Sequence, residues 1–140
     1  MAEVSDSVVR RERIFRPILV VDDDPFRAFA RCAALEAVFY GVTRAANAAE
    51  AFIRLDEPAF AGNLALTIAG LGLPGVAGPA FVRELIRRLP TTPILAVGRA
   101  GETVLDYPTR NVRFLPHQTS PAEILAAARE ILTQARARVA

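Results

Sequence analysis

The hydrophobic residues of this chain fall into short blocks that alternate between two spacings. Unbroken apolar runs are typical of strands buried on both faces of a parallel sheet. Apolar residues three and four positions apart are typical of helices that bury one face. The first pattern predicts strands at 18–21, 64–69 and 94–97, and two short mixed stretches, at 42–46 and 112–115, complete a set of five strands. The second pattern predicts four helices, at 26–40, 48–55, 79–89 and 121–137.

This alternation of strands and helices predicts an α/β fold, with a five-stranded parallel sheet covered by helices on both faces. The expected strand order is 2-1-3-4-5. The stretch 98–111 contains Gly101 and Pro108 and shows little helical periodicity, so the fourth helix is expected to be short or missing. The stretch 56–63, with a proline and a glycine, is expected to be a loop.

Turn and capping residues mark several of the boundaries. Asp24 is a favourable N-cap residue, and Pro25 after it suits the first turn of a helix, so a helix is expected to begin here. Ser120 and Glu123 have the spacing of a capping box around Pro121. We therefore expect one domain, residues 17–137, preceded by a flexible basic arm, residues 1–16.

The composition fits a single soluble globular domain. The chain has 140 residues, of which 52% are hydrophobic and 23% are charged. No apolar run is long enough to span a bilayer, and the first residues lack the pattern of a signal peptide, so a cytoplasmic location and no membrane contact are expected. A single cysteine and a single histidine exclude an internal disulfide and a zinc site.

The formal charge is +2, and all 17 basic residues are arginines. Four of them gather ahead of the first strand, at positions 10, 11, 13 and 16. Such an arm can touch an acidic partner or remain solvated and partly disordered. The charge is too mild, and no DNA-reading motif is present, so nucleic-acid binding is not expected.

The chemistry of the chain is concentrated where the first predicted strand ends. Asp22 and Asp23 follow this strand directly, and the carboxyl ends of parallel strands are where α/β proteins build their sites. Two adjacent carboxylates repel each other unless a cation or a basic side chain lies between them. The glycine-rich stretch 70–78 has neither the lysine nor the spacing of a phosphate-binding loop.

Four segments lie at the ends and starts of the predicted strands. They are Ile-Leu-Val-Val-Asp-Asp-Asp-Pro at 18–25, Gly-Leu-Gly-Leu-Pro-Gly-Val-Ala-Gly at 70–78, Pro-Ile-Leu-Ala-Val at 93–97 and Phe-Leu-Pro-His-Gln-Thr-Ser-Pro-Ala-Glu at 114–123. Together they resemble the response-regulator receiver domains of two-component signalling. The resemblance covers residues 17 to about 134. It implies a flavodoxin-like, doubly wound sheet.

In that family an acid pair after the first strand holds magnesium, an aspartate accepts the phosphoryl group, and a Ser or Thr and a lysine complete the site. The resemblance matches the acid pair to Asp22 and Asp23. It places Gly70 at the phosphoacceptor position, Gly98 at the Ser/Thr position and His117 at the lysine position. It also places Phe114 where the family often has a switch aromatic.

Two absences do not depend on the register of this match. No Asp or Glu occurs between Glu57 and Glu84, so the third strand cannot supply an acceptor carboxylate. The chain also contains no lysine. Without the nucleophile and the cation we expect no phosphorylation at the usual position and no enzymatic activity. With two carboxylates alone, magnesium binding is expected to be weak or absent, and no other cofactor is expected.

His117 has two interpretations, and the sequence does not choose between them. In the first, it lies across the strand ends as an imidazolium beside Asp22 and Asp23. In the second, it is an exposed loop histidine without a partner.

The resulting hypothesis is a stand-alone, atypical receiver domain that acts by protein contact. A histidine kinase, another signalling protein or a second copy of the chain is the expected partner. One alternative is a small-ligand sensor, in which Gly70, Gly72 and Gly98 leave a concavity beside the acid pair, unless the loops collapse into it. The other alternative is a regulator phosphorylated at a non-standard residue.

Overall fold

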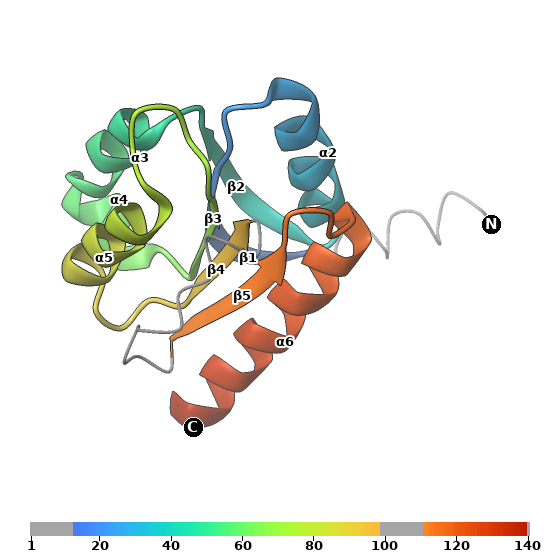
Figure 1. Cartoon of the computed structure of the whole chain (residues 1–140). Coiled ribbons are helices and arrows are strands. Elements are labelled where there is room, and N and C mark those ends of the chain that lie inside the picture. The colour runs from blue at the N-terminus through green and yellow to red at the C-terminus, as the bar shows by residue number, and fades with distance from the viewer. Residues whose placement is uncertain (1–12, 99–110, 140) are drawn as a thin grey trace.

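The computed structural model of the chain describes residues 13–98 and 111–139. Within them, five parallel strands form one sheet in the order β2-β1-β3-β4-β5 (Figure 1). Their bounds are β1 Ile14–Val21, β2 Phe39–Ala45, β3 Leu66–Gly70, β4 Ile94–Gly98 and β5 Val112–Pro116. The predicted sheet and its strand order are confirmed.

Helices cover both faces of this sheet, as expected for a doubly wound fold. Figure 1 shows α2 (Pro25–Glu36) and α6 (Pro121–Val139) on one side. On the other side lie α3 (Ala48–Leu55), α4 (Pro58–Asn63) and α5 (Gly78–Arg88). The described part of the chain thus has three layers, with the sheet in the middle.

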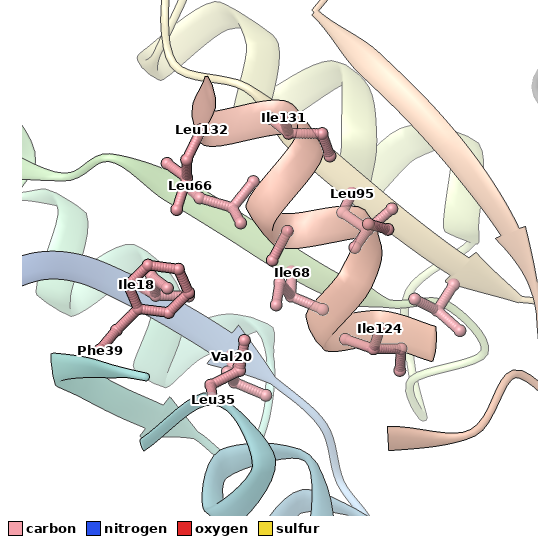
Figure 2. Close-up of a cluster of buried hydrophobic side chains, with 13 residues drawn as sticks. Ile18, Val20, Leu35, Phe39, Leu66, Ile68, Leu95, Ile124, Ile131 and Leu132 are labelled. Carbon is pink, nitrogen blue, oxygen red and sulfur yellow. The ribbon is translucent and has the colours of Figure 1, made fainter. Parts of the chain in front are cut away.

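The alternation of side chains along the strands divides the core into two clusters. On β1, Ile18 and Val20 point toward α2 and α6, and Leu19 and Val21 point toward α3 and α5. Figure 2 shows the first cluster, in which residues of α6 pack over the sheet. All four β1 side chains are fully buried. Burying a side chain of this size stabilises the fold by about 1.5–3 kcal/mol, so β1 anchors both layers.

Two predicted boundaries were wrong. The helix expected to reach residue 40 ends at Glu36, and β2 begins at Phe39 because that side chain is buried in the first core cluster. Gly41 lies inside β2 with φ +98°, a conformation that glycine adopts without a Cβ penalty. The loop expected at 56–63 contains α4, which Pro58 opens at its first helical turn.

The capping predictions are confirmed. Asp24 accepts hydrogen bonds from the backbone N–H groups of Phe26 and Arg27 at 2.9 and 3.1 Å. Ser120 and Glu123 exchange the two bonds of a capping box, at 3.0 and 3.2 Å. These bonds satisfy N–H groups that a helix start would otherwise leave without partners.

The N-terminal arm predicted at residues 1–16 ends earlier than expected. β1 begins at Ile14, and its first two residues pair with Phe39 and Tyr40 of β2, so the end of the expected arm 1–16 is strand. Residues 1–12 and the expected short fourth helix, within 99–110, lie outside the described residues.

None of the helices in the described ranges is both long enough and apolar enough to cross a membrane.

Candidate functional site

The fold brings the predicted site positions to one edge of the sheet. Asp22 follows the last residue of β1, Gly70 and Gly98 end β3 and β4, and His117 follows the last residue of β5. These four strands are neighbours in the sheet and run parallel, so their carboxyl ends lie side by side. The matched positions therefore share an edge, as the sequence predicted.

Asp22 is the centre of this edge, and its side chain is fully buried, with 0% exposed. Arg27, in the first turns of α2, holds it with a two-pronged contact. The Nε of Arg27 donates to Oδ2 of Asp22 at 2.9 Å, and its Nη2 donates to Oδ1 at 2.7 Å. This fork matches the planar guanidinium to the planar carboxylate, which is the strongest form of such a pair.

Two further donors complete the contacts of Asp22. Arg31, itself 3% exposed, donates from Nη1 to Oδ2 at 3.0 Å, and the backbone N–H of Asp24 donates to Oδ1 at 3.0 Å. Each carboxylate oxygen thus accepts two hydrogen bonds. A carboxylate has about four lone-pair sites, so the acceptor capacity of Asp22 is filled by the protein.

A third arginine fixes the backbone at the same point. Arg44 of β2 donates from Nη2 and Nε to the carbonyl oxygen of Asp22, at 2.9 and 3.3 Å. Asp23 points to the exposed side, and its closest ion-pair contact is with Arg27, at 3.5 Å. Three carboxylates, from Asp22, Asp23 and Asp24, therefore face three guanidinium groups, and their formal charges balance.

The electrostatics follow from these contacts. The hydrogen bond to Asp22 raises the pKa of Arg27 above its usual value. Burial lowers the pKa of Arg31, and the charge of Asp22 opposes this effect. An arginine stays protonated in proteins despite such a shift. The backbone N–H of Arg27, as the largest cause, lowers the pKa of Asp24.

The residues present do not fit a magnesium ion at the acid pair. Magnesium needs carboxylate oxygens with free lone pairs in near-octahedral geometry, and those of Asp22 are already engaged by arginine and backbone donors. Two guanidinium groups also place positive charge where the ion would bind. Among the residues that the structure describes, no group of three or more potential metal-binding side chains occurs.

Gly70 has no room for a side chain. A Cβ at this position would lie 2.7 Å from the backbone carbonyl oxygen of Val21 on the neighbouring strand. Real Cβ atoms essentially never approach an atom this closely, and a backbone oxygen of a central strand cannot swing aside as a side chain does. The backbone of β1 therefore leaves no space for a side chain at the end of β3.

Gly98 and His117 lie at the ends of β4 and β5. Gly98 pairs with Pro116 at the end of β4, which leaves His117 one residue beyond the sheet. His117 is half-buried, and within the described ranges no hydrogen bond or ion pair joins it to Asp22 or Asp23. The pairing partner of Asp22 is therefore arginine and not His117.

Phe114, matched to the switch aromatic, is half-buried on β5. It packs against a small core cluster of Leu71, Val82 and Ala96. This contact places the ring between β4 and α5.

A cavity of about 260 Å³ lies at the opposite end of the strands from Asp22. It is lined by Pro93 before β4, by residues 111–113 at the start of β5, and by Ile131, Gln134 and Ala135 of α6. It does not include the acid pair or the glycines that the ligand-sensor alternative requires.

Sequence reasoning missed the three arginines of this site. One signal was present for Arg31. Positions 28, 31, 32 and 35 have the i, i+3, i+4, i+7 spacing of the buried stripe of α2, and an arginine inside such a stripe requires a buried anion. Arg27 lies one turn earlier, within reach of the same carboxylate. For Arg44 the sequence carries no comparable signal, because its contact with Asp22 depends on strand register.

Solved structures of receiver domains resemble this chain in their arrangement of strands and helices. The receiver domain of the hybrid histidine kinase CckA is 26% identical, with a TM-score of 0.68, and the match covers 83% of this chain and 98% of that one. A CheY-like response regulator receiver domain protein from Methanospirillum hungatei JF-1 is 20% identical, with a TM-score of 0.75 and coverages of 89% and 98%. The fold is that of a response-regulator receiver domain.

A further receiver domain, from an HD domain-containing protein of Pseudomonas fluorescens Pf-5, matches with a TM-score of 0.71 at 20% identity. That match covers 91% of this chain and 92% of the other. No protein-family model matches the sequence, and no curated protein is significantly similar to it. The receiver fold is therefore visible in the structure although the sequence has diverged from that of its structural neighbours.

Proposed function

We propose that this chain is an atypical receiver domain that acts in signal transduction through protein contact, without phosphorylation at the usual position and without enzymatic activity. The observation that carries the proposal is the buried Asp22, whose four acceptor sites are filled by Arg27, Arg31 and a backbone N–H. A divalent ion at this position would have to displace bonds that the fold itself provides.

The closed end of β3 supports the same proposal. Phosphoryl transfer to a receiver needs a carboxylate nucleophile in line with the donor phosphate, with positive charge to neutralise the transition state. Gly70 offers no nucleophile, and Val21 leaves no space for one. The charge at this edge is already balanced by internal ion pairs.

A module of this kind has one fixed arrangement of charges at the edge where other receivers change state. Its output then depends on which proteins contact its surface. The structural neighbours include a receiver from a hybrid histidine kinase and one from an HD domain-containing protein. By analogy we propose a histidine kinase or another signalling protein as the partner, or a second copy of the chain.

Incubation with acetyl phosphate and magnesium, followed by intact-mass measurement, tests the central claim. We expect the mass to stay unchanged over a time in which a receiver with an acceptor aspartate, run in parallel, gains one phosphoryl group. A stable gain of one phosphoryl group by this chain would contradict the proposal. The residue that carried the group would then identify a non-standard acceptor.

A further inference from the structure

Helix α2 carries two apolar stripes, of which the fold uses one. The inner stripe contains Ala28, Cys32 and Leu35, and it packs on the sheet. The outer stripe has the spacing i, i+3, i+4, i+7, i+11 and lies on the opposite side of the helix. Its members are Phe26, Phe29, Ala30 and Ala33, followed by Ala37, the C-cap residue one position beyond the helix.

The outer stripe is open to solvent. Phe26 is 86% exposed and Phe29 is 76% exposed. Ala33 and Ala37 are exposed, and Ala30 is half-buried. Two neighbouring phenylalanines exposed on one helix face are unusual for a protein without a partner. A stripe of this period is the seam against which a second helix packs.

We infer that the outer stripe of α2 packs antiparallel against the same stripe of a second copy of this chain. The inference rests on the proposed function, which requires a contact surface, and names that surface. The large residues Phe26 and Phe29 occupy the first half of the stripe, and the small residues Ala33 and Ala37 occupy the second half. An antiparallel pair therefore sets the rings of each copy on the alanines of the other.

Charged side chains flank α2 at both ends. Asp23 and Asp24 stand before the helix, with side chains 38% and 46% exposed, and both carboxylates also pair with Arg27. At the other end, the exposed Arg13 donates from Nη1 to the carbonyl oxygen of Glu36 at 3.1 Å. In an antiparallel pair, Asp23 and Asp24 of one copy face the end of α2 that carries both Arg13 and the exposed Glu36 of the other. The orientation is therefore favoured by the opposed helix dipoles and not by net charge.

The area of the stripe indicates how strong the contact is. A phenylalanine buries about 150–250 Å² when it is covered, so four exposed rings contribute on the order of 600 Å² to a symmetric dimer. Stable interfaces bury about 1,200–2,000 Å² in total, and the alanines and flanking polar residues must supply the remainder. We therefore expect a weak and reversible dimer.

Sedimentation velocity of the full chain from about 1 µM to about 500 µM tests this inference. We expect the sedimentation coefficient to rise with concentration toward that of a dimer. The double substitution Phe26→Ser and Phe29→Ser should keep the chain monomeric over this range. Ile53→Ser is the matched control, because Ile53 is also an exposed apolar side chain, 65% exposed, but lies on α3.

A charge exchange tests the antiparallel orientation without altering the apolar stripe. Arg13→Asp alone leaves only carboxylates at the facing ends, so it should weaken the dimer at least about fivefold. Adding Asp23→Arg restores opposite charges across a two-fold axis, so the two substitutions together should recover most of the affinity. Circular dichroism of each variant checks that the fold is retained.

A chain that stays monomeric at the highest concentration would overturn the inference, as would dimerisation that is unaffected by the two serine substitutions. Dimerisation lost equally in the Ile53→Ser control would place the contact elsewhere and also overturn it. None of these results bears on phosphoryl uptake. The acetyl phosphate experiment can therefore fail or succeed independently.

Discussion

Arg31 and Asp22 form an ion pair in which both side chains are buried, with Nη1 of the arginine 3.0 Å from Oδ2 of the aspartate. The arginine comes from the inner stripe of α2, and the aspartate comes from the end of β1. Charges buried this completely persist only with a partner, since desolvation of an isolated ion costs several kcal/mol. This pair therefore depends on both elements being in place.

The first prediction concerns the carboxylate of Asp22. Asp22→Asn removes the anion and leaves Arg31 buried beside a neutral amide, so the free energy of unfolding should fall by about 3–5 kcal/mol. Asp23→Asn, at a more exposed carboxylate, should cost less than about 1 kcal/mol. Urea unfolding followed by circular dichroism measures both. Equal costs for the two variants would contradict the assignment of Asp22 as the buried partner.

A second substitution shows whether the cost of Asp22→Asn comes from an unpaired buried charge or from a change in side-chain shape. Arg31→Met in the Asp22→Asn background removes the unpaired cation and keeps most of the side-chain volume. We expect the double variant to be more stable than Asp22→Asn alone, because a neutral apolar group at a buried site needs no counter-charge. A double variant less stable than Asp22→Asn would show that the cation is not the source of the cost.

The second prediction concerns magnesium. Magnesium chloride at about 10 mM should raise the Tm of the natural chain no more than sodium chloride of equal ionic strength does. Arg27→Ala frees two acceptor positions on Asp22, so this variant should gain a saturable magnesium-dependent rise in Tm. Arg54→Ala, which removes an arginine in a longer ion pair of 3.9 Å, is the control. A saturable rise in the natural chain would refute the prediction.

The third prediction concerns the closed end of β3. Gly70→Ala brings a Cβ to 2.7 Å from the carbonyl oxygen of Val21, and relieving this overlap should cost about 1–3 kcal/mol of stability. Gly62→Ala is the matched control, because nothing lies within 4 Å of a Cβ there. That control should be neutral or up to about 1 kcal/mol stabilising, since alanine favours a helix over glycine. Thermal unfolding of the two variants compares them directly.

The close approach of Val21 to position 70 also predicts that a single substitution cannot create a phosphoacceptor there. Gly70→Asp meets the same overlap as alanine and also lacks a magnesium site beside it. We expect Gly70→Asp to gain no phosphoryl group from acetyl phosphate, as measured by intact mass. Efficient phosphorylation of this variant would show that β1 gives way and that the arginine contacts of Asp22 do not block the ion.

The fourth prediction concerns pH and the carboxylate of Glu84. Hydrogen bonds from Arg87 and then from Arg88 lower the pKa of Glu84 from 4.5 to about 2. Because the pKa is lower in the folded chain, the stabilisation is present above about pH 4.5 and is lost as the pH falls toward about 2. Glu84→Gln should therefore be less stable than the natural chain at pH 7, and the difference should disappear near pH 2.

Urea midpoints measured from pH 7 downward follow this difference. Glu57→Gln is the control, because Glu57 makes a single longer contact with Arg54, at 3.9 Å. We expect its effect to stay small over the whole range. A Glu84→Gln difference that is constant with pH would mean that the contact acts through packing of Arg88, which lies over the ring of Phe52, and not through charge.

The sequence predicted those parts of the fold that depend on local patterns. The apolar run 18–21 identified β1 because a strand buried on both faces has no polar alternation to obscure it. The helix start at Asp24 was predictable from capping chemistry alone. The start of β2 was not, because Phe39 continues the helical spacing of α2, and only its burial in the first core cluster places it in a strand.

The sequence predicted where the candidate site lies, but not which side chains pair with its carboxylates. The sequence placed Asp22, Gly70, Gly98 and His117 at one edge, which strand order confirmed. It also indicated that a basic side chain or a cation must neutralise the acid pair. Which residue does so depends on how α2 rotates against the sheet, and that rotation is set by Ala28, Cys32 and Leu35 together rather than by any single residue.

The filled carboxylate of Asp22 also has a consequence for the order in which the chain folds. If β1 entered the core before α2 had docked, Asp22 would lose its water without gaining Arg27 and Arg31. If α2 docked first, Arg31 would be buried without an anion. Because each buried charge needs the other, we expect residues 18–35 to form one cooperative unit in which strand and helix assemble together.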